Sequence, residues 1–384
     1  MKSTKKAMSL LLFIAIAVSA AFGATAFAAP PAPSVDAPSV CLIEKETGTI
    51  IFEHNAHEKL APASVTKVMT MLLCMEALDS GQISRDDMVS ISAHAMSMGG
   101  SQVFLAEGEQ YSVDDLMKGM IIASGNDASV ALAEHISGSE TAFVALMNQR
   151  AAELGMTNTH FVNCCGLDAD GHETTSYDIA LMSASLVRNH PTVRDYTTIW
   201  QDSLRDGTFG LDNTNKLVRF YAGATGLKTG STGKAKCCIA ASAERDGIEF
   251  VAVVMAAHNS DTRFRTAKEL LDYGFAHYTL KDTTSDVKLT PVTVLKGLQD
   301  TVDTQVVGNQ RILVEKVNAG KIEVNADIVS DVEAPVVEGQ KLGVITLTLD
   351  GEIIATHDVV AVESVERKTW THFFNDLLER VTMR

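Results

Sequence analysis

The chain has few of the basic residues that nucleic-acid-binding proteins use and few of the cysteines that disulfide-rich proteins use. It has 32 lysine and arginine residues and 48 aspartate and glutamate residues, which gives a formal net charge of −16. Nucleic-acid binding usually shows a basic footprint, so the composition argues against a nucleic-acid partner. Six cysteines in 384 residues are too few for a disulfide scaffold. We interpret the two adjacent pairs, Cys164-Cys165 and Cys237-Cys238, as small buried hydrophobic residues rather than bridges.

The sequence also lacks the usual signatures of a metal site and of a second membrane segment. Its eleven histidines include no His-Glu-x-x-His pattern, and no Cys/His spacing is typical of zinc. We therefore expect no metal and no other cofactor, which argues against a metallopeptidase. After the N-terminal region, no stretch approaches 18 uninterrupted apolar residues, so we expect a mature protein that is soluble or peripherally attached.

The N-terminus has the three parts of a secretory signal peptide. Three lysines precede an apolar run over residues 8–22, and Ala26-Phe27-Ala28 then fits the small-x-small cleavage pattern. The apolar run is short for a bilayer span, so we favour cleavage over a transmembrane anchor. We predict a signal peptide over 1–28, export of the protein, and a mature chain that begins at Ala29.

Strand patterns enclose a helical region. Residues Val40–Glu53 predict a hairpin around a Thr47-Gly48 turn, and Cys237–Ala243 with Ile248–Ala256 predict a second one around Asp246-Gly247. Between the hairpins, apolar residues recur at helical spacing, and Ser112 resembles an N-cap. The predicted helices are Val65–Leu78, Val113–Ile122, Ala128–Ile136 and Ala142–Leu154. We expect one α/β (α+β) domain over 29–280, with an antiparallel sheet and a helical cluster.

The pattern changes after Tyr278 to short alternating strands, which predict a small all-β domain over 281–365. Residues 366–384 then predict an amphipathic helix, because large apolar side chains follow one another at steps of three and one. These residues are Trp370, Phe373, Phe374, Leu377, Leu378 and Val381. The helix either packs on the β domain or lies in a membrane interface, and we favour membrane attachment because aromatic residues crowd one face.

Ser64-Val65-Thr66-Lys67 opens a helical pattern directly after Pro62. Residues three apart share a helix face, so the Ser64 hydroxyl and the Lys67 amine are expected to be neighbours. An amine can activate a serine only in its neutral form, and lysine ordinarily titrates at about 10.4, so burial or another cation must lower its pKa. Other Ser-x-x-Lys patterns begin at Ser3, Ser231 and Ser285, but only Ser64 opens a helix after a strand pair.

Two further motifs follow along the chain. Ser124-Gly125-Asn126 lies between two predicted helices, where a tight loop can present a hydroxyl and an amide to a cleft, although a helix-capping loop is the simpler alternative. Lys228-Thr229-Gly230 leads into the hairpin that contains Cys237. In this order, the three motifs match the signature of penicillin-binding proteins and class A β-lactamases.

The chain resembles the low-molecular-mass D-alanyl-D-alanine carboxypeptidases from about Val40 to its C-terminus. The resemblance implies a serine β-lactamase/transpeptidase-like domain, an appended β domain and a membrane anchor. One departure is Cys164-Cys165, where relatives often have other residues, and this leaves redox sensitivity near the cleft open. Besides the three motifs, the resemblance rests on Ala61-Pro62-Ala63-Ser64, Cys165-Gly166-Leu167-Asp168 and Gly223-Ala224-Thr225-Gly226-Leu227-Lys228-Thr229-Gly230.

The resemblance also implies catalytic roles. Ser64 would attack the carbonyl of the penultimate D-alanine of a peptidoglycan stem peptide, with Lys67 accepting its proton. Ser124 would relay a proton to the departing D-alanine, while Asn126 holds the substrate amide or orients Lys67. Penicillin and other β-lactam antibiotics would acylate the same serine.

The resemblance also implies which residues would bind the substrate. Lys228 would lower the pKa of Lys67 and, with Thr229, attract the terminal carboxylate. Backbone N–H groups of Ser64 and Ser231 would hold the oxyanion, and Gly230 would allow the substrate close to the strand. Arg263 resembles a family arginine that contacts the carboxylate, although Arg265 is close enough in sequence to compete for the role.

Three other functions stay open at this point. A D,D-endopeptidase would use the same acyl-enzyme chemistry. A class A-like β-lactamase needs a glutamate that positions water, and Glu153 is a candidate that lies more simply on the wet face of its predicted helix. A non-catalytic β-lactam sensor would need a signalling segment, for which the C-terminus offers only a surface helix.

Overall fold

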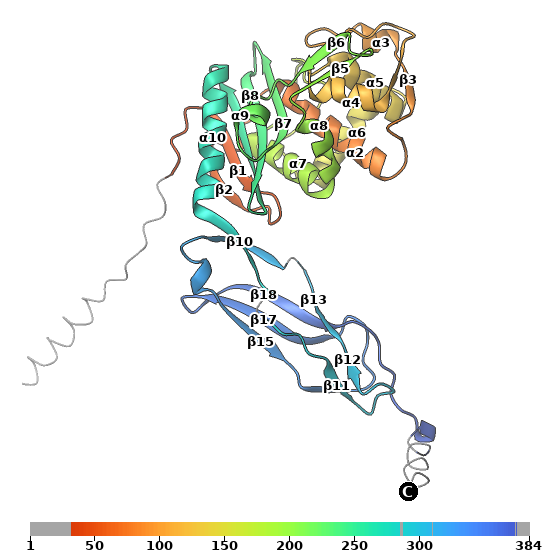
Figure 1. Ribbon diagram of the computed structural model, residues 1–384, viewed down its shortest axis with the longest axis vertical. Helices are drawn as coiled ribbons and strands as arrows, with labels where there is room; N and C mark the ends of the chain where they lie inside the picture. The colour runs from red at the N-terminus through yellow and green to blue at the C-terminus, as the bar shows by residue number, and fades with distance from the viewer. Residues whose placement is uncertain (1–31, 285–286, 309, 373, 375–384) are drawn as a thin grey trace, which may run out of the picture. The chain divides into compact units, whose positions relative to one another are not determined.

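A computed structural model describes residues 32–284, 287–308, 310–372 and 374 (Figure 1). The predicted signal peptide over 1–28 and most of the predicted C-terminal helix lie outside the described residues. From Ser34 onward, both predicted domains belong to one compact unit, Ser34–Arg384. Over the part of the chain that the structure describes, no helix is long and apolar enough to span a membrane.

A five-stranded antiparallel sheet forms the centre of the N-terminal part. It joins the two predicted hairpins, because the first strand of one pairs with the last strand of the other, from Ser39↔Met255 to Glu44↔Phe250. The sheet is therefore assembled from segments about 200 residues apart, as the strand patterns predict. Its order is β2 (Ile50–His54), β1 (Ser39–Glu44), β9 (Ile248–Ala257), β8 (Lys236–Arg245) and β7 (Ala224–Thr232).

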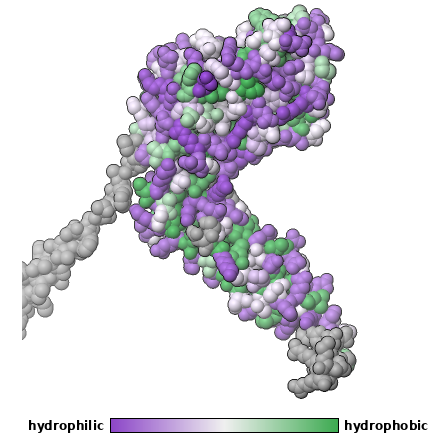
Figure 2. Space-filling model, in the orientation of Figure 1, coloured by the Kyte–Doolittle hydropathy of each residue, from purple (hydrophilic) through white to green (hydrophobic). Residues whose placement is uncertain are grey.

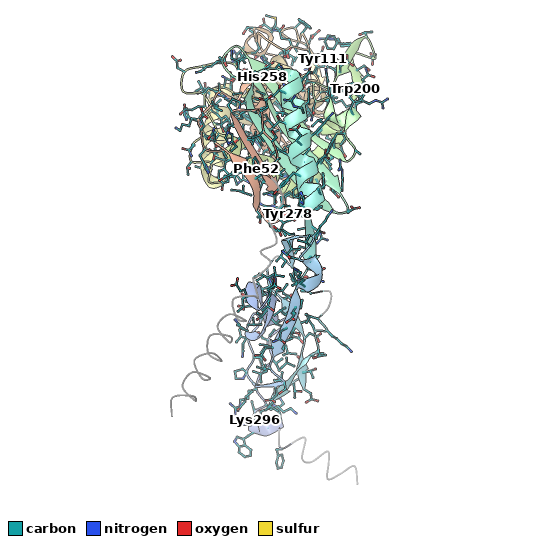
Figure 3. The ribbon with its side chains drawn as sticks, turned by 90° about the vertical axis from the view of Figure 1, so that its left-hand side faces the viewer. Phe52, Tyr111, Trp200, His258, Tyr278 and Lys296 are labelled. Atoms are coloured by element: carbon teal, nitrogen blue, oxygen red, sulfur yellow. The ribbon has the colours of Figure 1, made fainter. Side chains whose placement is uncertain are left out.

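Both faces of this sheet are buried, because its central strands alternate between two apolar cores. On β9, Phe250 and Val254 pack on one side, while Val251 and Val253 pack on the other. The first side faces α10 (Ser260–His277), which crosses in front of the sheet in Figure 3, from near His258 down to Tyr278. The second side faces the helical cluster.

The helical cluster confirms the four predicted helices, with changes of one or two residues at their ends. The first prediction begins with a 3₁₀ turn, η1 (Ala63–Thr66), before the α-helix proper. Ser112 caps its helix as expected, since its hydroxyl accepts the Asp115 N–H at 3.0 Å. The helices are α2 (Lys67–Asp79), α4 (Val113–Ile121), α5 (Asn126–Ser137) and α6 (Glu140–Glu153), with α7 (Ser176–Asn189) packed between α2 and the sheet.

Short elements complete this part. The hairpin of β5 (Gln201–Leu204) and β6 (Phe209–Asp212) matters most for the site. Hydrophilic side chains cover much of the surface in Figure 2, as expected where the apolar residues are enclosed. The other short elements are β3 (Met88–Ser90), α3 (Ala93–Met96), β4 (Gln110–Ser112), η2 (Pro191–Val193), α8 (Arg194–Thr197) and α9 (Leu217–Phe220).

The C-terminal part is all β over the described residues, apart from η3 (Ala319–Lys321) and the start of a helix at Trp370. Ile345, Leu347 and Val359 form one of its two small cores. Trp370 is 89% exposed, and most of the predicted C-terminal helix lies outside the described residues. The three sheets are β10 (Tyr278–Asp282) with β14 (Arg311–Glu315); β12 (Thr301–Val302), β11 (Val292–Leu295) and β16 (Asp331–Glu333); and β13 (Thr304–Val306), β18 (Glu352–Ala361), β17 (Lys341–Leu349) and β15 (Glu323–Ile328).

Candidate active site

The Ser-x-x-Lys motif stands where η1 passes into α2. Ser64 is partly exposed in η1, and Lys67, the first residue of α2, is fully buried. The Lys67 Nζ lies 3.2 Å from Ser64 Oγ, 2.6 Å from Asn126 Oδ1 and 2.7 Å from the Cys165 carbonyl oxygen. A neutral amine has two N–H bonds and one lone pair. If the two stronger acceptors, Asn126 and Cys165, take the N–H bonds, the lone pair faces the Ser64 hydroxyl.

Burial shifts the titration of this amine toward neutral pH. It lowers the pKa of Lys67 to about 8, while the neighbouring Cys165, Cys164 and Asp127 act in the opposite direction. A general base is most effective when its pKa is near the working pH. The environment of Lys67 therefore suits it to accept a proton from Ser64.

Two glycines let neighbouring segments approach the backbone of Ser64. A side chain at Gly166, whose φ is +90°, would overlap the Ala63 carbonyl and lie 2.9 Å from Ser64 N. A side chain at Gly230 on β7 would lie 2.6 Å from Ser64 N. The expected role of Gly230, access for the substrate, therefore gains a second reason: β7 itself packs against the turn that carries Ser64.

The Lys-Thr-Gly motif lies on the edge strand β7. Lys228 is fully buried, and its Nζ donates to the Thr229 carbonyl at 3.0 Å. Burial and the charge of Lys67 lower the pKa of Lys228 well below its usual range, so the two amines interact across the site. The Thr229 hydroxyl donates to Thr214 Oγ1 at 2.8 Å, and Lys228 Nζ lies 3.5 Å from the same atom.

Thr214 is a site residue that none of the three motifs predicts. It follows β6, and its N–H donates to the Ile122 carbonyl at 3.3 Å, close to the Ser124 loop. The two asparagines beside it fold the loop on itself, since Asn213 Oδ1 accepts the Asn215 N–H at 2.8 Å. The polar triplet Asn213-Thr214-Asn215 between buried leucines is the sequence signal that identifies such a loop.

Ser124 occupies a sharp corner between α4 and α5. Its φ is +67°, which is uncommon outside glycine, and its side chain is only 4% exposed. The corner is held by the Gly125 N–H, which donates to the Gly119 carbonyl at 2.9 Å. Within the described residues the Ser124 hydroxyl has no hydrogen-bond partner. Asn126, at the start of α5, reaches Lys67 as described.

The structure separates the two arginines that compete for the carboxylate. Arg263 is 7% exposed and its Nη1 donates to the carbonyls of Gly230 and Cys238, both at 3.2 Å, so it lies against β7 and β8. Arg265 is exposed and pairs with Asp36 at 2.7 Å. Of the two, only Arg263 borders the site, while Ser231 lies exposed on β7 opposite Cys237.

The cysteines are free thiols, as the sequence interpretation predicts. Cys164, Cys165 and Cys238 are buried, and Cys237 is half-buried. Hydrogen bonding from Cys164 and the nearby Lys67 lower the pKa of the Cys165 thiol to about 7. Its backbone has a role that no motif predicts, since the Cys165 carbonyl is the third partner of Lys67.

Glu153 takes no part in this site. It ends α6, is exposed, and bonds to Gln149 and Arg150. This confirms that it lies on the wet face of its helix. Among the described residues, no carboxylate hydrogen-bonds to Ser64 or Lys67, and no cluster of histidine, cysteine, aspartate or glutamate side chains suits a metal.

Comparison with known proteins gives a family for this geometry. The family model described as D-alanyl-D-alanine carboxypeptidase matches residues 25–259, and that of the penicillin-binding protein 5 C-terminal domain matches 279–367. The chain is 42% identical over 345 residues to the D-alanyl-D-alanine carboxypeptidase DacF of Bacillus subtilis, covering 88% of each protein.

Solved structures agree with the sequence comparison. Penicillin-binding protein 5 of Haemophilus influenzae matches with a TM-score of 0.78 and 29% identity, over 88% of this chain and all of that one. Penicillin-binding protein D2 of Listeria monocytogenes, solved with ampicillin bound, matches with a TM-score of 0.58 and 31% identity, over 64% of this chain and all of that one. These matches confirm the predicted mixed catalytic fold followed by a β-rich domain, and the chain belongs to the D-alanyl-D-alanine carboxypeptidase family.

Proposed function

We propose that this protein is a serine D,D-carboxypeptidase that removes the terminal D-alanine from stem peptides of peptidoglycan. The observation that carries the proposal is the buried Lys67, whose amine contacts Ser64 Oγ, Asn126 Oδ1 and the Cys165 carbonyl together. Such an amine can take the proton of a serine without a histidine. The family of the chain supports the substrate class.

In the acylation step, neutral Lys67 accepts the Ser64 proton as Oγ bonds to the carbonyl carbon of the penultimate D-alanine. The carbonyl oxygen becomes an oxyanion, for which the N–H groups of Ser64 and Ser231 are the proposed donors. The bond to the terminal residue then breaks, and Ser124 passes a proton from Lys67 to the departing amine. Ser124 is buried, and its hydroxyl has no hydrogen-bond partner among the described residues, which supports this relay.

The terminal carboxylate is the group that β7 recognises in this proposal. The hydroxyls of Thr229 and Thr214 lie 2.8 Å apart beside Lys228, and Arg263 lies against Gly230 on the same strand. A carboxylate bound there would place a negative charge beside the buried amine of Lys228. This charge would raise the pKa of Lys228 again. Recognition of the carboxylate and retention of positive charge on Lys228 are therefore coupled.

Water completes the cycle by attacking the acyl carbon, which releases the shortened peptide and restores the Ser64 hydroxyl. A β-lactam enters the same acylation step, but its leaving group stays tethered. The ampicillin-bound relative supports this inhibition for the present chain. The absence of a carboxylate bonded to Ser64 or Lys67 among the described residues argues against rapid β-lactam hydrolysis.

The proposal also assigns a function to each segment of the chain. Residues 1–28 direct export, 29–280 form the D,D-peptidase domain, 281–365 form the β domain and 366–384 attach the protein to the outer face of the cytoplasmic membrane. Trp370 at the start of the last segment is 89% exposed, as expected for an interfacial residue. Removing 370–384 should abolish binding to anionic lipid vesicles and leave D-alanine release in solution unchanged.

The test compares the mature protein with Ser64→Ala, using a peptide that ends in D-Ala-D-Ala and a labelled penicillin. The proposal expects one D-alanine released per peptide and long-lived penicillin labelling, both lost in the variant. Rapid penicillin hydrolysis with an intact peptide would support a β-lactamase instead. Stable labelling without D-alanine release would indicate a sensor or an endopeptidase, and a crosslinked peptide dimer as substrate separates these two.

A further inference from the structure

The geometry points to Asp127 as a positioning residue for Lys67, acting through the segment Gly99–Leu105 and the side chain of Asn126. The proposal rests on the proposed function, because it concerns the base of that reaction. Asp127 follows the Ser124-Gly125-Asn126 motif directly and contacts neither Ser64 nor Lys67 by a hydrogen bond.

Asp127 is a buried carboxylate whose partners are backbone N–H groups. It is 1% exposed, and its oxygens accept the N–H of Val103 at 3.0 and 3.1 Å, of Leu105 at 3.2 Å and of Ala128 at 2.9 Å. No lysine or arginine of the described chain pairs with it. A buried charge of this kind needs its hydrogen bonds, so the carboxylate holds the backbone at Val103 and Leu105 firmly.

The segment that Asp127 holds is the one that orients Asn126. The Asn126 N–H donates to the Ser101 carbonyl at 2.8 Å, and the Asn126 Nδ2 donates to the Gly99 carbonyl at 2.7 Å. With Nδ2 fixed there, Oδ1 is the end of the amide that faces Lys67, at 2.6 Å. If Gly99 moved, the amide could turn, and Nδ2 would then place a donor against the donors of Lys67.

Arg205, in the turn between β5 and β6, also binds the backbone of the segment Gly99–Leu105. Its Nη2 donates to the carbonyls of Val103 at 2.9 Å and Phe104 at 2.7 Å. Phe104 has a φ of +57°, which is rare for an aromatic residue, and its ring is 68% exposed. The carboxylate of Asp127 and the guanidinium of Arg205 thus fix the N–H and the C=O groups of one strained stretch from opposite sides.

Asp127 also acts on Lys67 through its charge. The titratable groups that face Lys67 are Asp127 from α5, Cys164 and Cys165 from the loop before Gly166, and Lys228 from β7. The negative charge of Asp127 favours the protonated amine and so raises the pKa of Lys67, which burial lowers. Removing the charge should lower the pKa of Lys67. The acid limb of the profile of acylation rate against pH should then move to lower pH.

The experiment measures the acylation rate by labelled penicillin against pH, for the wild type and Asp127→Asn. We expect a plateau rate about tenfold lower, because the amide of Asn126 is no longer held. We also expect the acid limb of the pH profile to move to lower pH, because the negative charge near Lys67 is lost. Asp178→Asn is the matched control: Asp178 is also 1% exposed, accepts the Asn158 N–H at 3.0 Å, and does not act on Lys67. It should lower the melting temperature without moving the acid limb.

A second variant keeps the proposal testable if Asp127→Asn does not fold. Arg205→Met loosens the same segment without changing the charge near Lys67, so it should lower the plateau rate and leave the acid limb in place. A wild-type pH profile and plateau in Asp127→Asn, or a wild-type plateau in Arg205→Met, would overturn the proposal. Since acylation by penicillin is the readout, the result stands apart from whether the wild type releases D-alanine.

Discussion

Gly166→Ala provides a sharp test of how closely the active site is packed. The residue has a φ of +90°, and an added Cβ would overlap the Ala63 carbonyl and lie 2.9 Å from Ser64 N. The backbone conformation alone costs about 1–2 kcal/mol for a residue with a side chain. The overlap is with backbone, so Ala63 and Ser64 must move by roughly 1 Å, a misplacement that can cost on the order of 100-fold in rate.

The matched control is Gly155→Ala. Gly155 has a similar φ of +76°, but nothing lies within 4 Å of an added Cβ. Both variants should therefore lose about 1–2 kcal/mol of stability from the backbone conformation. Only Gly166→Ala should also slow acylation by labelled penicillin, by roughly 100-fold, or about 2.7 kcal/mol in activation free energy. Thermal unfolding and acylation are measured on both proteins, and equal acylation rates would refute the reasoning.

Three further predictions follow from the charges and hydroxyls of the site. The acid limb of kcat/KM should lie near pH 8, because activity rises as Lys67 loses its proton and burial lowers its pKa to about 8; a limb below pH 6 would mean that another group is the base. Thr214→Val should raise KM roughly tenfold for a peptide with a free carboxylate and leave an amidated analogue unaffected, since the hydroxyl 2.8 Å from Thr229 Oγ1 is lost. Arg263→Met should raise KM in the same way while Arg265→Met should not, because only Arg263 lies against β7; equal effects in steady-state assays would contradict this placement.

The secondary structure and the places of the three motifs within it could be predicted because they depend on local patterns. Turn residues such as Thr47-Gly48 and Asp246-Gly247 fix two hairpins, and helical spacing after Pro62 places Ser64 and Lys67 on one face. The pairing of the two hairpins into one sheet also follows, since each leaves an apolar strand without a partner. Local patterns were therefore sufficient for the architecture and for the neighbouring positions of Ser64 and Lys67.

The partners of Lys67 and Lys228 could not be predicted in the same way. The Cys165 carbonyl is a backbone group, which every residue has, so no side-chain pattern marks it. Thr214 reaches Lys228 from a loop that only the fold of β5 and β6 brings there. The packing of Gly166 on Ala63 likewise depends on tertiary approach, although the glycine itself is visible in the sequence.

The segments that meet at Lys67 share one backbone property. Ala63, Ser124 and Gly166 all have positive φ, at +49°, +67° and +90°, and the first two carry side chains that make this conformation costly. These residues stand directly before Ser64, two positions before Asn126 and directly after Cys165. The packed core holds all three residues in these conformations. The stability of the fold therefore offsets their conformational free energy before any substrate binds. The groups around Lys67 therefore need little reorganisation during the reaction, which is the condition under which fixed dipoles and a buried base are most effective.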